Sequence, residues 1–302
     1  MSNGSPIGVA LEPLLTRYAA WLGMDEAQVL ADRDEDPDQV RAIQIVLRLE
    51  KGDPPSWHAA LALAATGCAA LCTDPRSEPG GEWFDAVNAY CHGHIRKVTR
   101  RARGAQWEAT ADLPGLTLTD GDTQVRVLVP TLVTDLDKRV SKLQVGGTDL
   151  PIDDESTVVA APREEPFASS GTAAPAEAET PSVQARESGS PLLTVHVPAD
   201  GPAAAMTAGK LMAQTGHAGM IAAALLAGSD QPTLAAWREA GCPSRVTRTP
   251  AAPWQHLLAD VADPATAWRD HHLLAVRDAG FTEVAPGTVT VVARLDGDAK
   301  PR

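Results

Sequence analysis

The chain has 302 residues, enough for about two domains that each bury a core. Its hydrophobic content of 44% and charged content of 22% are typical of a globular protein. Aromatic residues make up only 4%, which excludes a broad stacking surface for single-stranded nucleic acid. The net charge of −13 disfavours nucleic-acid binding unless the acidic residues are concentrated in one part of the chain.

The N-terminal sequence and the cysteines bear on the compartment. The sequence MSNGSPIGVALEP lacks a basic region followed by an apolar one, and no apolar window is long enough to span a bilayer. We therefore predict a cytoplasmic protein with no membrane segment. No second Cys or His pair stands at zinc-ligand spacing, so neither a metal nor a disulfide is expected. The cysteines concerned are Cys68, Cys72, Cys91 and Cys242.

A change in composition divides the chain. Residues 151–190 are rich in Pro, Ala, Ser, Glu and Thr, and they cannot bury enough apolar surface to offset the entropy of ordering. The sequence thus predicts four segments, with a helical extension at 1–37, a first α/β block at 38–150, a disordered acidic linker at 151–190 and a second α/β block at 191–296.

The first block is expected to have the order β-α-α-β-α-β-β. Its last two strands are joined by the sequence DGD, which is a strong hairpin signal. The expected strands are 42–50, 95–102, 115–120 and 123–129, and the expected helices are 57–72, 81–91 and 105–111.

The second block is expected to have the same order. Thr207 is a suitable N-cap for its first and longest helix. The expected strands are 192–197, 244–249, 272–279 and 288–295, and the expected helices are 207–226, 233–241 and 253–262. Each block is therefore predicted to be α/β, with a mixed sheet of about four strands and helices on both faces.

Two local similarities suggest that the fold occurs twice, with the first copy degenerate. AATGCAAL at 64–71 resembles AQTGHAGM at 213–220, and RKVTRRARGAQW resembles SRVTRTPAAPW. In this alignment the first copy has Leu61, Ala65 and Cys68 where the second has polar residues. Chance similarity between two Ala-rich helices is the competing explanation.

Polar residues at helical spacing mark the second block. In GKLMAQTGHAGM, Lys210, Gln214 and His217 follow one another at spacings of four and three, which places them on one face of a helix. Asp278 follows a strand, with Thr282 in the next loop, and this edge of the sheet is where ligands bind in open α/β folds. The alternatives are a solvated helix face and a turn-forming aspartate. Neither a phosphate-binding loop nor a G-x-S-x-G motif is present.

Together these stretches resemble the type II peptidyl-tRNA hydrolase family, whose motifs are G-K-x-x-A-Q-x-x-H-A and D-A-G-x-T-Q-x-x-P-G-x-x-T-V. The resemblance covers about residues 192–295. It implies hydrolysis of the ester between a peptide and the tRNA 3′ end, with peptidyl-tRNA as the partner and without a metal or other cofactor. It also implies catalytic roles for Lys210, Gln214, Asp278 and Thr282, with His217 as an additional site residue.

The chain departs from the family motifs in two ways. Glu283 stands where the family usually has Gln, and the stretch before the helix lacks the family's lysines. Phosphate contacts are therefore expected elsewhere. The candidates are two basic strands that contain Arg96, Lys97, Arg100, Arg101 and Arg103 in the first block and Arg245 and Arg248 in the second.

The basic strands allow a second interpretation, because charged edge strands also prevent sheet-to-sheet association. If they bind tRNA, the two blocks are expected to act as a pseudo-dimer within one chain rather than as a homodimer. For the reaction, we expect Asp278 to orient or deprotonate water and Lys210 to neutralise the developing charge. We expect Gln214 to hold the peptide or ribose. The competing function is a noncatalytic tRNA- or ribosome-associated binding protein.

Overall fold

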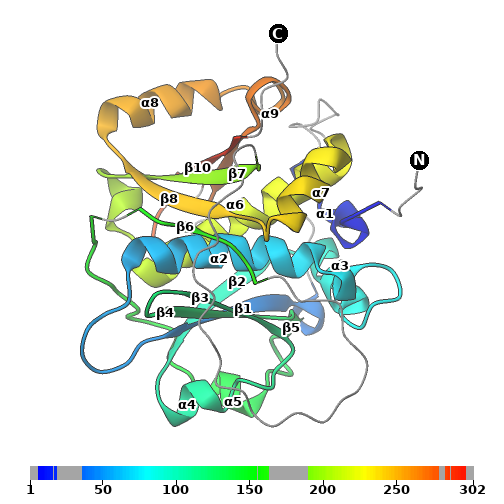
Figure 1. Cartoon of the computed structure of the whole chain (residues 1–302), viewed down its shortest axis with the longest axis vertical. Helices are drawn as coiled ribbons and strands as arrows, with labels where there is room; N and C mark the ends of the chain where they lie inside the picture. The colour runs from blue at the N-terminus through cyan, green and yellow to red at the C-terminus, as the bar shows by residue number, and fades with distance from the viewer. Residues whose placement is uncertain are drawn as a thin grey trace.

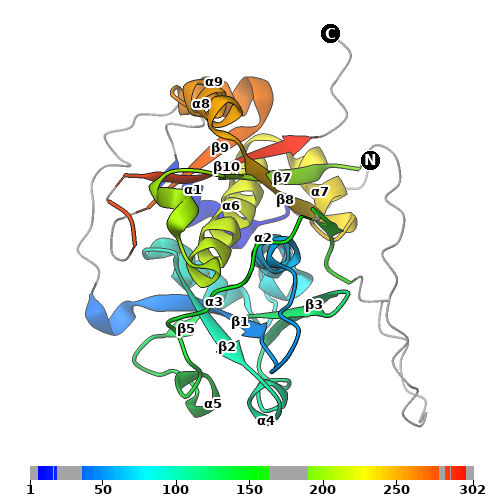
Figure 2. The same cartoon turned by 90° about the vertical axis from the view of Figure 1, so that its left-hand side faces the viewer.

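Two mixed β-sheets enclose a layer formed by two long helices (Figure 1). The computed structural model describes residues 6–15, 17–18, 36–154, 156–162, 190–278, 283–285 and 287–296. The two central helices are α2 (Trp57–Thr73) from the first block and α6 (Ala208–Ser229) from the second. Figure 2 shows them side by side between the sheets.

The first sheet has the order β2-β1-β4-β3, with β5 paired to β1. β1 is parallel to β2 and antiparallel to β4, which forms a hairpin with β3. The strands are β1 (Arg41–Arg48), β2 (Arg96–Ala102), β3 (Gly115–Asp120), β4 (Thr123–Leu128) and β5 (Thr131–Leu132).

The second sheet has the order β6-β8-β7-β10-β9. β7 is parallel to β8 and antiparallel to β10, which pairs with β9. The strands are β6 (Val158–Val159), β7 (Leu192–Pro198), β8 (Ser244–Thr249), β9 (Leu273–Arg277) and β10 (Val289–Asp296). The four main strands thus have the same order and directions in both sheets. The α/β fold is confirmed, whereas the internal repeat stays a prediction.

Shorter helices cover the outer faces of the sheets and the end of the helical layer. In Figure 1, α4 and α5 lie below the first sheet, and α8 and α9 lie above the second. The α-helices are α1 (Glu12–Leu15), α3 (Phe84–His92), α4 (Ala105–Glu108), α5 (Lys138–Ser141), α7 (Gln231–Glu239), α8 (Ala251–Asp260) and α9 (Pro264–His271). The 3-10 helices are η1 (Val9–Leu11), η4 (Pro37–Gln39), η5 (Pro75–Ser77) and η6 (Pro202–Ala205). Of the predicted extension at 1–37, only part is described, and it begins with η1 and α1.

Small residues allow α2 and α6 to approach closely. A Cβ atom added to Gly219 would lie 2.1 Å from the backbone oxygen of Ala65, so only glycine fits there. The Oγ1 atom of Thr215 donates a hydrogen bond to the backbone oxygen of Leu61 at 2.8 Å, which also ties the helices together. One hydrophobic cluster extends from Ile43 to Leu295. The two blocks therefore share a core.

Part of the predicted disordered linker is ordered, which corrects that prediction. Val158 and Val159 form β6 and pair with the edge of β8. The carboxylate of Asp153 accepts a hydrogen bond from the backbone N–H of Trp57 at 2.7 Å and pairs with His58 at the start of α2. This strand was not predicted because its two valines stand among acidic and small residues in the sequence. Residues 163–189 lie outside the described part of the chain.

Helix α6 is long and apolar enough to cross a membrane by length and composition, but 83% of its most apolar window is buried inside the protein. It therefore has the surroundings of a core helix. All four cysteines are free and buried.

Candidate active site

The first turns of α6 present the predicted polar face toward β9 and β10. Thr207 caps the helix, because its Oγ1 accepts a hydrogen bond from the backbone N–H of Lys210 at 3.3 Å. Ala, Gly and Met surround the polar residues in the sequence and let the helix pack on neighbouring elements on its other sides. Lys210 and Gln214 lie one helical turn apart and point to the same group.

That group is the carboxylate of Asp278, directly after β9. The Nζ atom of Lys210 lies 2.5 Å from its Oδ2 atom, and the two side chains are 16% and 4% exposed. The backbone of Asp278 is held on both sides, since its N–H donates to the oxygen of Thr288 at 2.9 Å and its oxygen accepts from the N–H of Gly287 at 2.7 Å. The two motifs, distant in the sequence, meet as expected.

Gln214 holds the carboxylate rather than facing outward. Its Nε2 atom donates a hydrogen bond to Oδ2 of Asp278 at 2.7 Å, and its Oε1 atom accepts one from Oγ1 of Thr290 at 2.8 Å. Gln214 is 3% exposed and Thr290 is fully buried. Both ends of the amide are thus bonded within the protein, and the expected contact of Gln214 with the peptide or ribose stays a prediction. Thr290 was missed, and its only signal is a hydroxyl within the apolar strand sequence VTVVA.

His217 lies farther along the same side of α6. Its Nδ1 atom is 3.4 Å from Nζ of Lys97, which belongs to β2 of the first block. Burial lowers the pKa of His217 well below its ordinary value, and the charges of Lys97 and Lys210 lower it further. The imidazole is therefore neutral at physiological pH.

Two of the predicted tRNA contacts point into the protein. The ammonium group of Lys97 donates to the hydroxyl of Tyr90 at 3.2 Å and to the sulfur of Met220 at 3.3 Å, and burial lowers its pKa. Arg100 is 9% exposed and donates to Oε1 of Gln44 at 2.7 Å and to the backbone oxygen of Leu143 at 3.0 Å. Both cations are therefore bonded to groups inside the protein rather than directed outward.

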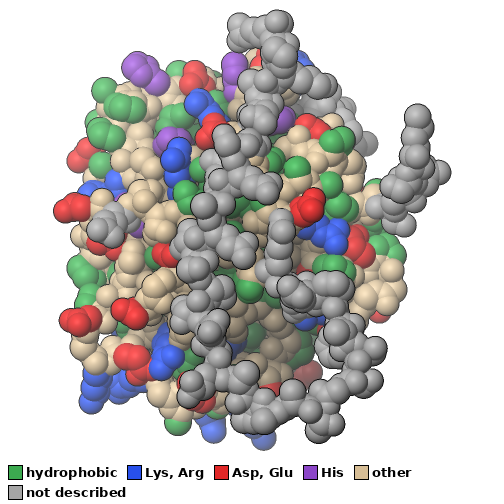
Figure 3. Space-filling model, viewed as in Figure 1, with side chains coloured by type: hydrophobic (Ala, Val, Ile, Leu, Met, Phe, Trp, Pro, Cys, Tyr) green, Lys and Arg blue, Asp and Glu red, His purple; other side chains and the backbone are tan. Residues whose placement is uncertain are grey.

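The remaining candidate cations differ in exposure. Arg103 and Arg248 are exposed, whereas Arg96, Arg101 and Arg245 are half-buried. Figure 3 shows Lys and Arg side chains gathered at the end of the molecule that carries α4 and α5. The exposed cations on or beside these helices, here named the basic end, are Arg103, Lys138 and Lys142. The last two were not singled out in the sequence, because they do not form a run.

Glu283 binds the N-terminus of α6. Its carboxylate oxygens accept hydrogen bonds from the backbone N–H and the Oγ1 atom of Thr207 at 2.8 and 2.9 Å. An acidic group is favourable there because of the helix dipole. The loop after Asp278 is thus fastened to the helix that carries Lys210. The predicted site residue Thr282 lies outside the described residues.

An ammonium group and an amide directed at one carboxylate, near the edge of a mixed sheet, define a site suited to acid–base chemistry. Among the residues that the structure describes, no group of three or more His, Cys, Asp or Glu side chains is placed to hold a metal ion.

Residues 201–296 match the model of a family described as peptidyl-tRNA hydrolase PTH2. This range contains Lys210, Gln214 and Asp278, so the segment that forms the site resembles that hydrolase family. No curated protein and no solved structure shows significant similarity to the chain.

Proposed function

We propose that this protein hydrolyses the ester bond between a peptide, or an N-blocked amino acid, and the 3′ end of tRNA. The observation that carries the proposal is the convergence of Lys210 and Gln214 on the Asp278 carboxylate. It occurs within the segment that matches the peptidyl-tRNA hydrolase family. Release of tRNA from such esters is a cytoplasmic reaction of translation, which agrees with the predicted location.

Ester hydrolysis needs a water molecule that loses a proton and a cation near the carbonyl oxygen. We propose that Asp278 orients the water and accepts its proton as the water oxygen bonds to the ester carbon, and that Lys210 leaves the carboxylate to stabilise the negative charge on the carbonyl oxygen. The proton then passes from Asp278 to the ribose 3′ oxygen as the ester C–O bond breaks. The 16% exposure of the Lys210 side chain gives its ammonium group access to the surface, while the carboxylate lies deeper. Thr282 is proposed to help hold the water.

Gln214 is proposed as a positioning residue. Thr290 fixes the Oε1 end of its amide, so the Nε2 end is directed at Asp278. His217, kept neutral by its surroundings, is proposed to support the helix face rather than to carry a proton. The reaction as proposed uses no cofactor.

The tRNA backbone is proposed to contact exposed cations. Arg248 lies at the end of β8 in the second sheet, and the basic end lies on the outer face of the first sheet (Figure 1). These exposed cations are few for a chain of net charge −13. Because the salt dependence of binding grows with the number of phosphate contacts, salt is expected to weaken tRNA binding only moderately.

The test is single-turnover hydrolysis of N-acetyl-aminoacyl-tRNA by the full chain. Asp278→Asn and Lys210→Met should each lower the rate by about 10²–10⁴-fold, the usual contribution of a general base or an oxyanion-stabilising group. The matched controls Asp122→Asn and Lys51→Met change exposed residues outside the site and should retain the wild-type rate. Wild-type rates in both site variants would refute the assignment.

The competing function is noncatalytic binding of tRNA or the ribosome. One observation favours it, because the Asp278 side chain is only 4% exposed and is already bonded to both Lys210 and Gln214. The same assay decides between the two functions. A wild-type chain that binds the tRNA without releasing the acyl group would be a binding protein.

A further inference from the structure

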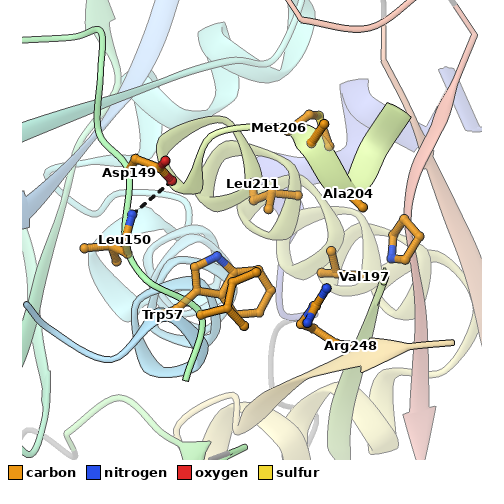
Figure 4. A pocket seen from close by; sticks show the side chains of 11 residues that line it. Trp57, Asp149, Leu150, Val197, Ala204, Met206, Leu211 and Arg248 are labelled. Carbon is orange, nitrogen blue, oxygen red and sulfur yellow. Dashed lines mark hydrogen bonds between the residues drawn. The ribbon is translucent and has the colours of Figure 1, made fainter. Parts of the chain in front are cut away.

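A cavity of about 330 Å³ lies where the two blocks meet beside the start of α6 (Figure 4). Trp57, at the start of α2, and Leu150 come from the first block, and Ile152 comes from the segment that follows this block. Val197 and Arg248 are contributed by β7 and β8 of the second block. The cavity therefore exists only because the two blocks are packed together.

The cavity lies next to the proposed catalytic site. Leu211, which lines it, directly follows Lys210 on α6, so the two side chains are about 100° apart around the helix. Met206, also a lining residue, directly precedes the Thr207 cap that Glu283 binds. A substrate whose ester reaches Lys210 therefore has its adjoining groups within reach of the cavity.

The lining combines apolar walls with one cation and one anion. Trp57, Val197, Leu211 and Met206 provide apolar surface, and Figure 4 shows Arg248 across from Trp57. The guanidinium of Arg248 donates to the backbone oxygen of Ala199 at 3.1 Å, which keeps it at the rim. One indole ring and aliphatic walls, with a guanidinium at the rim, suit a planar base attached to a phosphate.

The cavity has a fixed shape, whereas the peptide part of the substrate varies from one molecule to the next. The 3′-terminal adenosine is the same in every tRNA. A site of about 330 Å³ is at the small end of ligand pockets and matches one nucleoside better than a peptide. The volume and the lining therefore both favour the nucleoside.

We propose that this cavity binds the terminal adenosine of the tRNA, with the base between the apolar walls and Arg248 toward its 5′ phosphate. The carboxylate of Asp149 at the rim is the acceptor suited to the adenine amino group. This proposal rests on the proposed function. It gives the first block a direct part in substrate binding.

The test uses adenosine 5′-monophosphate as the probe and the full chain as the protein. Binding is measured by ligand-detected NMR, with cytidine 5′-monophosphate as the comparison. Ala204→Trp fills the cavity from the half-buried lining residue Ala204, and Arg248→Ala removes the cation. Each should weaken binding of adenosine 5′-monophosphate by about tenfold, while the matched control Ala252→Trp on the exposed face of α8 should not.

The outcomes separate this proposal from the proposed function. The cavity proposal would be overturned if wild type and Ala204→Trp bound the probe equally, with both proteins shown to be folded by thermal melting. The cavity proposal would also be overturned if Ala204→Trp changed only the relative rates of hydrolysis of N-acetyl-alanyl-tRNA and N-acetyl-phenylalanyl-tRNA. The cavity would then hold the acyl group. Probe binding that Ala204→Trp abolishes would support the cavity even if no hydrolysis were detected.

Discussion

The ammonium group of Lys97, on β2 of the first block, lies 3.4 Å from Nδ1 of His217 on α6 of the second. An ammonium can only donate, so Nδ1 of the neutral imidazole is the acceptor and the ring proton lies on Nε2. His217 shares a helix side with Lys210 and Gln214. The first block thus sets the tautomer, and adds to the effect of burial on the charge, of a residue beside the proposed catalytic site.

Replacing Lys97 should not weaken tRNA binding. Lys97→Met keeps a long apolar side chain in the interior, whereas Arg103→Ala removes an exposed cation of the basic end. We expect the slope of log affinity against log salt to stay unchanged in the first variant and to fall by about 1 in the second. Filter binding of tRNA over a salt series measures both slopes. A smaller slope in Lys97→Met would instead indicate that Lys97 contacts a phosphate of the tRNA.

Acid should destabilise the protein partly through His217. Its pKa in the folded chain lies well below the ordinary value of 6.5, so between these two values the unfolded chain binds a proton that the folded chain does not. Stability is therefore lost as the pH falls below about 6.5, by up to about 1.4 kcal/mol per pH unit for this group. Urea unfolding at pH 7.5 and 5.5 should show a smaller loss in His217→Gln than in wild type. The exposed His256→Gln is the control and should behave like wild type.

Thr290→Val should impair catalysis without affecting tRNA affinity. The change keeps the shape of the side chain but removes the donor to Oε1 of Gln214, which leaves a buried acceptor without its partner. The Gln214 amide would then hold Asp278 less firmly. We expect kcat to fall by about tenfold with KM within about twofold, because only the positioning of the carboxylate changes. A raised KM with an unchanged kcat would instead point to substrate contact.

Glu283→Gln should bring the α6 N-terminus closer to the family motif. Gln keeps an acceptor for one hydrogen bond from Thr207, but the negative charge at the helix N-terminus is lost. The free energy of unfolding should fall by about 0.3–1 kcal/mol. Affinity for tRNA should rise modestly, since one charge that repels phosphate is removed. The corresponding change at an exposed glutamate away from both the site and the basic end, Glu82→Gln, is the control for net charge.

Gly219→Ala should separate the two central helices. The new methyl group would meet the backbone oxygen of Ala65 at 2.1 Å, and backbone atoms cannot move aside as a flexible side chain can. We expect a loss of about 1–3 kcal/mol in the free energy of unfolding, as for overpacked cores. Gly146→Ala, where an added Cβ atom meets nothing within 4 Å, should leave the melting temperature nearly unchanged.

Local pattern was sufficient to predict the four main strands and the longest helix of each block, and to bring Lys210 and Gln214 to Asp278, but it missed α5, α9, β5 and β6. Spacings of four and three placed Lys210 and Gln214 on one side of a helix, and the end of a strand placed Asp278 at the same edge. These inferences need only the helical repeat and the strand order. They hold because the surrounding residues follow their intrinsic preferences.

What could not be predicted depends on which side chains pack together, both between the two blocks and within the second. Lys97 and Arg100 look like surface cations in a basic strand. Only the position of β2 beside α6 and residues 143–144 shows that the Lys97 ammonium points inward and that Arg100 is buried. Thr290 looks like an ordinary strand residue until Gln214 is placed beside it. Contacts between distant segments carry no local signal in a single sequence.

The α2–α6 interface belongs to a single polypeptide, so dilution cannot dissociate it. Specific activity should accordingly be the same at nanomolar and micromolar protein. A fragment restricted to the second block would expose the side of α6 around Gly219 to water. Its alanine, methionine and leucine side chains would then form an apolar patch that favours association with other molecules. Covalent connection to the first block keeps that apolar surface covered.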